Sequence, residues 1–255
     1  MISFFKENPE LYEKTFGYRN FKEQVNFLDK VFKKYRVKSV LDIACGHIPH
    51  GRILEKRGYK VSGLDVVHSL LKLGRKRAVE EKININLYKK DMTNFYIKKF
   101  DAAYIMFNSI LHLTSYNQLY SHFESVNRNL KRKGIYIIDL SQSSFKNPFK
   151  RHKINRKILG IRSVITYTPK NPRNLLAEFK VDTYYNKKKY TDKFPVLMFL
   201  PINLLQSLAH ETGFKIVALF SDFTFKKDLK NNNFTYIAIL QKVMTNSPNS
   251  SKQER

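Results

Sequence analysis

Val37-Lys38-Ser39-Val40-Leu41-Asp42-Ile43-Ala44-Cys45-Gly46-His47-Ile48-Pro49-His50-Gly51 is the stretch that decides the fold. Its apolar part is short and rich in β-branched residues, which is typical of a central parallel strand and not of a core helix. The strand meets an acid at Asp42 and runs into a turn of small residues, and Pro49 suits the first turn of a helix. Ligands of open α/β sheets bind at such strand ends, where the backbone approaches closely and the next helix presents unpaired N–H groups. We therefore interpret this stretch as a cofactor-binding loop.

A second strand with an acidic end follows the helix after this loop. It is Tyr59-Lys60-Val61-Ser62-Gly63-Leu64-Asp65. Asp65 lies at about the 20-residue spacing expected of a carboxylate that binds a ribose. Two strand ends, each closed by a carboxylate, are thus predicted to flank one crevice of nucleoside size.

The composition is that of a globular protein without a membrane span. The chain has 255 residues, 42% of them hydrophobic, and no apolar run approaches the ~18 residues of a transmembrane helix. The N-terminus lacks the pattern of a secretory signal, so we expect a cytoplasmic location. Cys45 is the only cysteine, which excludes an internal disulfide and a zinc cluster, and we expect no metal site.

The charge is strongly positive, with 47 Lys and Arg against 21 Asp and Glu and a formal net charge of +26. Such a field favours binding to nucleic acid or to another anionic surface. The alternative is a biased composition in which lysine serves as an ordinary solvated surface residue. The densest group of basic residues is Lys146, Lys150, Arg151, Lys153, Arg156 and Lys157.

The loop and the second strand together resemble the class I, Rossmann-like S-adenosylmethionine-dependent methyltransferases. The similarity is closest to a small-molecule N-methyltransferase-like subgroup, in which Leu-Asp-x-Ala-Cys-Gly-Thr-Gly-x-His precedes Gly-Tyr-x-Val-x-Gly-x-Asp. The matching residues here are 41–50 and 58–65. The chain departs from the pattern at His47 and Ile48. A β-branched residue does not easily take a positive φ, so Ile48 predicts weaker cofactor binding.

The resemblance implies a cofactor, S-adenosyl-L-methionine, and a role for each matching residue. Asp65 would hold the ribose hydroxyls, and Asp42 with the backbone of Ala44 and Gly46 the methionine end. Asp91 and Met92 would meet the adenine, although an aspartate after a strand is also a common turn former. The cofactor-binding residues predicted in this way are Asp42, Ala44, Cys45, Gly46, Asp65, Val66, Asp91, Met92 and Phe107.

The acceptor side is predicted after the fourth strand, which is expected at 100–107. Asn108 and Ser109 belong to a segment similar to the subgroup's Phe-Asn-Ser-x-x-x-x-Leu. The Asn/Asp-Pro-Pro-Tyr/Phe motif of base-amino methyltransferases is absent, which argues against adenine or cytosine as acceptor. His112 is the predicted catalytic base, or else a structural histidine. Tyr12 is either on the segment that closes over the methyl donor or a packing residue, and Tyr184 is predicted to face the substrate.

The whole chain is expected to form an α/β, Rossmann-like three-layer sandwich. Its sheet would be seven-stranded and mostly parallel with an antiparallel last strand, and a small antiparallel β-sheet would be inserted. Period-two runs at 161–168, 175–185 and 188–194 predict the inserted strands, and 131–134 predicts a turn. The expected division is a helical cap at 1–36, the cofactor-binding core at 37–145 and a lid at 146–200. The end of the core at 201–243 and a disordered tail at 244–255 would complete it.

The resulting hypothesis is transfer of a methyl group from S-adenosylmethionine to a nitrogen or oxygen of a small molecule. The charge leaves RNA methylation as an alternative, and Ile48 leaves a non-catalytic protein that retains the fold. The sequence predicts neither the acceptor nor an oligomeric state.

Overall fold

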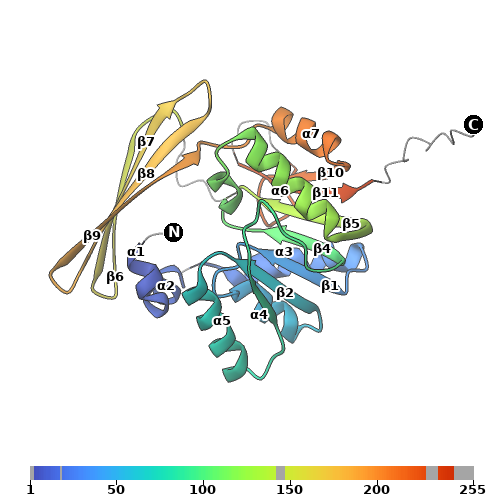
Figure 1. The fold of residues 1–255 in the computed structure, drawn as a ribbon, viewed down its shortest axis with the longest axis horizontal. Coiled ribbons are helices and arrows are strands. Elements are labelled where there is room, and N and C mark those ends of the chain that lie inside the picture. Colours follow the sequence, from blue (N-terminus) through green and yellow to red (C-terminus); the bar gives the residue numbers. More distant parts are fainter. Residues whose placement is uncertain (1–2, 18, 142–146, 228–234, 244–255) are drawn as a thin grey trace, which may run out of the picture.

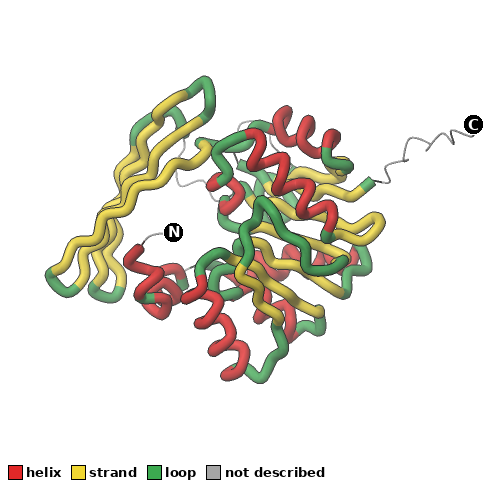
Figure 2. Tube along the Cα trace, viewed as in Figure 1, coloured by secondary structure: helices red, strands yellow, loops and turns green. Residues whose placement is uncertain are grey.

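The computed structural model describes residues 3–17, 19–141, 147–227 and 235–243. The predicted tail at 244–255 and Lys146 of the basic group lie outside these residues. Figures 1 and 2 show a core of strands between helices, and a separate, long antiparallel sheet beside it. Within the described residues, no helix is long and apolar enough to cross a membrane.

The core sheet has seven strands in the order β10-β11-β5-β4-β1-β2-β3. The first five strands in the sequence pair in parallel, whereas β11 runs antiparallel to both β5 and β10. The prediction of a mostly parallel sheet with an antiparallel last strand is therefore confirmed. The strands are β1 Ser39–Ile43, β2 Lys60–Asp65, β3 Asn86–Lys89, β4 Phe100–Ile105, β5 Leu130–Asp139, β10 Phe214–Phe220 and β11 Ile237–Lys242.

Helices cover both faces of this sheet, as a three-layer sandwich requires. On one face, α3 (Phe21–Lys34), α4 (Pro49–Lys56) and α5 (His68–Glu80) contribute apolar residues at helical spacing to one core cluster. On the other face, α6 (Tyr116–Arg128) and α7 (Ile202–Glu211) do the same, and the short 3-10 helix η1 (Ser109–His112) follows β4. Pro49 is the first residue of α4, as predicted.

The inserted sheet has four antiparallel strands in the order β6-β7-β8-β9. They are β6 His152–Ile158, β7 Ile161–Asn171, β8 Leu176–Tyr185 and β9 Lys188–Leu197. The sequence predicted the last three only. β6 was missed because three of its seven residues are Lys or Arg, which hide the apolar alternation typical of a strand.

The turn predicted at 131–134 is wrong. These residues belong to β5, which begins at Leu130 opposite Phe100 and then shifts register before Ile135 pairs with Ala102. Lys133 takes a φ of 60° at this irregularity. The basic residues and glycine that suggested a turn thus mark a bulge inside a strand.

Two short helices, α1 (Ser3–Glu7) and α2 (Pro9–Phe16), lie between the inserted sheet and the core (Figure 1). The next helix, α3, is N-capped by Asn20, whose side chain accepts a hydrogen bond from the Glu23 N–H at 3.1 Å. Phe4 of α1 packs against Tyr185 and Tyr190 of the inserted sheet. The N-terminal segment thereby joins the sheet to the core.

Candidate functional site

The loop after β1 contains three residues in the left-handed region. Ala44, Gly46 and Ile48 have φ values of 55°, 56° and 55°. The Ile48 side chain is fully buried in the core and is not among the residues that line the cavity described below. Ile48 therefore does adopt a positive φ, and its bulk points away from the cavity. The side chain therefore does not crowd the cavity, and the predicted weakening of cofactor binding stays a prediction.

Room for the Ile48 side chain comes from two glycines of neighbouring elements. A Cβ at Gly63 of β2 would lie 2.6 Å from Ile48 Cδ1, and a Cβ at Gly51 of α4 would also meet the Ile48 side chain. Real Cβ atoms do not approach other atoms that closely, so both positions require glycine while isoleucine stands at 48. The motif's usual glycine at 48 is thus replaced by an isoleucine that two other glycines accommodate.

Asp65, at the end of β2, holds the loop in place. Its carboxylate accepts hydrogen bonds from the Gly46 N–H and the Val67 N–H, each at 2.8 Å. Burial raises the pKa of this carboxyl, and these backbone N–H groups act against the rise. These hydrogen bonds therefore fix the loop against the end of β2.

A cavity of about 510 Å³ opens at the carboxyl ends of β1, β2 and β4. Its size is within the range of small-molecule and cofactor sites. It is lined by twelve of the predicted site residues: Tyr12, Asp42, Ala44, Cys45, Gly46, Asp65, Val66, Asp91, Met92, Phe107, Ser109 and His112.

Two predicted substrate-binding residues, Asn108 and Tyr184, are not among the lining residues. Tyr184 lies on β8, where Arg162 and Lys189 approach its ring at 5.4 and 5.7 Å. The inserted sheet instead contributes Phe194 of β9 to the cavity.

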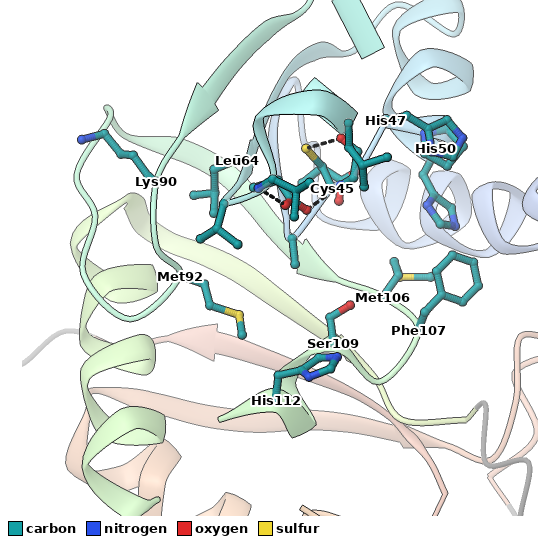
Figure 3. A pocket seen from close by; sticks show the side chains of 18 of the residues that line it. Cys45, His47, His50, Leu64, Lys90, Met92, Met106, Phe107, Ser109 and His112 are labelled. Carbon is teal, nitrogen blue, oxygen red and sulfur yellow. Dashed lines mark hydrogen bonds between the residues drawn. The ribbon is translucent and has the colours of Figure 1, made fainter. Parts of the chain in front are cut away.

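Figure 3 shows how the walls face each other. Cys45 and His47 of the loop form one side, and Ser109 and His112 lie across from them. Met92 lies at one end of the cavity and Phe107 at the other. The predicted cofactor residues thus face one common space with Ser109 and His112 of the acceptor side.

Asp42 is buried and accepts a hydrogen bond from the Tyr104 hydroxyl at 2.9 Å. Burial raises the pKa of the Asp42 carboxyl well above its usual range, and the hydrogen bond from Tyr104 acts in the opposite direction. Tyr104 comes from β4, the strand next to β1. This hydrogen bond therefore connects the end of β1 to β4, the strand that leads to the acceptor side of the site.

Asp139, at the end of β5, is a site residue that sequence reasoning missed. It is fully buried and accepts hydrogen bonds from the Phe107 N–H at 3.0 Å and from the Ser141 N–H at 2.9 Å. Phe107 and Asn108 have φ values of 56° and 57°, which is unusual for two consecutive residues with side chains. The Asp139 carboxyl secures this strained turn and so places Phe107 and Ser109.

The predicted adenine side is held by polar residues of α6. Asp91 forms a turn by accepting hydrogen bonds from the Thr93 N–H and hydroxyl, both at 2.7 Å, so its turn-forming role is present. His122 lies 2.8 Å from the Met92 carbonyl and 2.7 Å from the Tyr136 hydroxyl through its two ring nitrogens. The Ser125 hydroxyl donates to the Thr93 carbonyl at 3.0 Å. The segment after β3 is thereby fixed against the helix.

The N-terminal helix α2 is attached to the site through Glu13. Arg77 of α5 donates to Glu13 Oε2 at 2.6 Å, and Arg52 of α4 lies 3.4 Å from Oε1. His47 Nε2 lies 3.7 Å from the same Oε1. Burial alone would raise the pKa of Glu13, but the hydrogen bond from Arg77 and the nearby positive charges outweigh it and lower the pKa. α2, which also carries Tyr12, is thus held by ion pairs to α4 and α5, next to the cofactor loop.

Further lining residues were missed, among them Arg19, Phe21, His50 and Phe194. The Arg19 guanidinium lies 3.8 Å from the centre of the Phe107 ring. His50 is buried, and its Nε2 lies 2.8 Å from Gln24 Oε1. Phe21 packs edge-on against Phe107 and His50. The helical cap therefore supplies an aromatic and cationic wall, for which the sequence offered only amphipathic spacing as a signal.

His112 lies at the end of η1, with its ring 5.5 Å from the Phe194 ring. The residue is exposed, yet nearby atoms desolvate the imidazole and lower its pKa. A neutral imidazole at this edge of the cavity can accept a proton.

The buried histidines predict a pH dependence of stability. Burial lowers the pKa of His122 to about 4, below the ~6.5 of an unfolded histidine. As the pH falls below ~6.5, the unfolded chain therefore binds the proton first, and stability is lost progressively towards pH 4. For one group the slope approaches about 1.4 kcal/mol per pH unit.

We expect His122→Gln to remove this contribution. Urea unfolding between pH 7 and pH 5 should show a pH slope shallower than that of the parent chain by up to about 1.4 kcal/mol per unit. His210→Gln, at an exposed position of α7, is the control and should leave the slope unchanged. An unchanged slope in His122→Gln would contradict this reading of the buried ring.

Comparison with known proteins agrees with this architecture. Residues 40–134 match a family model described as a methyltransferase domain. The chain is 24% identical over 133 residues to a protein of Geobacillus sp. (strain WCH70), covering 51% of this chain and 54% of that one. It is 32% identical over 109 residues to YqeM of Bacillus subtilis (strain 168), covering 42% and 43%. Both are named as candidate methyltransferases, and the chain spans about half of their length.

Solved structures extend the likeness of the fold to almost the whole chain. A S-adenosylmethionine-dependent methyltransferase from Clostridium acetobutylicum ATCC 824 superposes with a TM-score of 0.79 at 15% identity, covering 94% of this chain and 99% of that one. The sugar N-methyltransferase KedS8 from Streptoalloteichus sp ATCC 53650 gives 0.72 at 15% identity, covering 92% of each chain. The chain thus has the class I, Rossmann-like methyltransferase fold, and the match to the family model lies at 40–134 within it.

Proposed function

We propose that this protein transfers a methyl group from S-adenosylmethionine to a nitrogen or oxygen of a small molecule. The observation that carries the proposal is one cavity lined by acids near three adjacent strand ends, Asp42, Asp65 and Asp91, within a methyltransferase domain. Ser109 and His112 line the same cavity, across from Cys45 and His47 of the loop. The arrangement holds a nucleoside on one side and leaves the other side to an acceptor.

The residues present fit this cofactor. Gly46 has a φ of 56° and no side chain, so the loop backbone is accessible where the methionine end would lie. Asp65 is fixed by two N–H groups at the position of a ribose-binding carboxylate. Met92 and the exposed Val66 offer apolar surface for an adenine ring. When bound, the sulfonium supplies an already electrophilic methyl group.

The protein's own contribution is then alignment, exclusion of water and handling of one proton. Tyr12 and Phe194 close the cavity from the cap and from the inserted sheet. His112, with its lowered pKa, is proposed to accept the proton that an amine or hydroxyl loses. The burial of Ile48 away from the cavity supports this proposal over the alternative of a non-catalytic protein that retains the fold.

An acceptor screen tests the proposal. The purified chain is incubated with S-adenosylmethionine and a panel of small amines and alcohols, amino sugars included, and S-adenosylhomocysteine is quantified by mass spectrometry. We expect turnover with at least one acceptor, and loss of most of it in His112→Ala. Turnover that requires RNA, with none on any small molecule, would contradict the small-molecule assignment.

The Glu13 ion pairs predict that the cap contributes to cofactor affinity. We expect Glu13→Gln to weaken binding of S-adenosylmethionine about tenfold, because the neutral amide no longer holds Arg77 and Arg52 and α2 loosens over the cavity. Glu10→Gln on the same helix is the control, since its ion pair with Lys76 is exposed on both sides. It should change the Kd less than about twofold. Equal effects of the two variants would show that the Glu13 contacts are not coupled to the site.

A further inference from the structure

The inserted sheet has two faces with different surroundings. One face packs against the rest of the protein, since Phe194 lines the cavity and Tyr185 and Tyr190 pack against Phe4. Side chains alternate along a strand, so the residues between these point to the other side. We call that other side the outer face. Arg156 of the basic group belongs to the inner face and lies beside Thr15 and Phe16, whereas Lys153 and Lys157 belong to the outer face.

Cations on the outer face form two rows that run across all four strands. Both rows follow from the pairing register of the sheet. Each row places side chains about 5 Å apart from strand to strand, and four residues along a strand separate the rows by about 13 Å. The first row is Lys157, Arg162, Tyr184 and Lys189, and the second is Lys153, Thr166, Lys180 and Lys193.

Several of these cations are arranged unfavourably in the protein alone. Lys157 is directly opposite Arg162, and Lys180 is directly opposite Lys193. Like charges at directly opposite positions destabilise a sheet. Asp182, between the rows, pairs with Lys180 at 3.0 Å and with Lys189 at 3.5 Å.

The remaining lysines of the rows are exposed and have no acidic partner within the described part of the chain. Among the residues that the structure describes, no carboxylate lies within ion-pair distance of Lys153, Lys157 or Lys193. An external anion would relieve the repulsion that the fold leaves uncompensated.

We propose that the outer face binds the phosphate backbone of a single-stranded nucleic acid. The rows cover the breadth of the sheet, which suits an extended polyanion, and the half-buried Tyr184 ring among cations suits a stacked base. A membrane fits less well, because docking on lipid needs apolar side chains for insertion and Val164, between the two rows, is only 7% exposed. The site is separate from the cavity and does not depend on the proposed methyl transfer.

The test uses the full chain and a fluorescein-labelled uridine oligonucleotide of about 15 nucleotides, followed by fluorescence anisotropy. The variant replaces Lys153, Lys157 and Lys193 with Gln. The matched control replaces Lys22, Lys60 and Lys72, three exposed lysines of the core, with Gln, so that both proteins lose the same charge. Thermal unfolding of both verifies folding, and the sheet variant should be at least as stable as the parent because like-charge contacts are removed.

The expected result is micromolar binding by the parent chain at 0.1 M salt. We expect the affinity for the oligonucleotide to fall at least tenfold in the sheet variant and to change less than about twofold in the control. The slope of log affinity against log salt concentration should be smaller by about two in the sheet variant only. Equal losses in both variants, or no binding by the parent, would overturn the proposal. Binding to phosphatidylserine vesicles without binding to the oligonucleotide would also overturn it and identify a lipid surface instead.

Discussion

Gly63→Ala is expected to lower the free energy of unfolding by about 3 kcal/mol. The added Cβ would lie 2.6 Å from Ile48 Cδ1, 2.8 Å from Cys45 Sγ and 3.0 Å from Leu87 Cδ2. Ile48 and Cys45 are buried, so the clash forces the cofactor loop to move away from β2. Because the same movement would disturb the Gly46 contact with Asp65, cofactor binding should weaken together with stability.

A double-mutant cycle separates this mechanism from a general intolerance of side chains at 63. Ile48→Val removes the Cδ1 atom that clashes and by itself should cost about 1 kcal/mol. In the Gly63→Ala/Ile48→Val double variant we expect a total cost at least about 1 kcal/mol below the sum of the single costs. Strict additivity in urea unfolding would mean that Ile48 does not occupy the space that Gly63 leaves.

Asp139→Ala is the second change with a large expected effect. It leaves the partly buried N–H groups of Phe107 and Ser141 without their acceptor, which costs up to about 1–3 kcal/mol for each group. It also releases the turn in which Phe107 and Asn108 have positive φ. We therefore expect a loss of about 3 kcal/mol in stability and a fall of more than tenfold in methyl transfer.

Asp139→Asn is the variant to compare with Asp139→Ala. One amide oxygen can still accept a hydrogen bond, although the amide nitrogen cannot replace the second carboxylate oxygen. Stability and turnover should therefore lie between those of the parent chain and those of Asp139→Ala. If Asp139→Ala retained full turnover in the mass spectrometric assay, the carboxyl would have no part in positioning Phe107 and Ser109.

The strand-end residues could be predicted from the sequence because topology alone brings them together. In a parallel sheet the carboxyl ends of neighbouring strands meet at one edge, so Asp42 and Asp65 had to lie close once their strands were recognised. The cap and the inserted sheet follow no such rule. Arg19 and Phe194 reach the cavity only through tertiary packing of separate elements, which no local pattern reports.

Strand register explains the wrong expectation for Tyr184. Neighbouring residues of a strand point to opposite faces, so Tyr184 and Tyr185 cannot both face the core. The sequence left the register open, and packing of Tyr185 and Tyr190 around Phe4 decides it. Tyr184 therefore lies on the outer face with Arg162 and Lys189.

Ile48 shows the limit of a rule applied to one residue. Isoleucine does disfavour a positive φ. The conformational cost at this position is offset because the side chain is completely buried in apolar surroundings. The compensating glycines, Gly51 and Gly63, lie in two other elements. Only the folded arrangement shows that they belong together.

The central claim, that the cavity holds S-adenosylmethionine, is tested most directly by calorimetric titration. The purified chain, freed of nucleic acid, is titrated with S-adenosylmethionine beside Asp65→Asn, which retains the shape of the side chain without its charge. The account predicts binding in the micromolar range by the parent chain and a loss of at least about tenfold in the variant. Absence of binding by the folded parent chain at millimolar cofactor, or equal binding by both proteins, would contradict it.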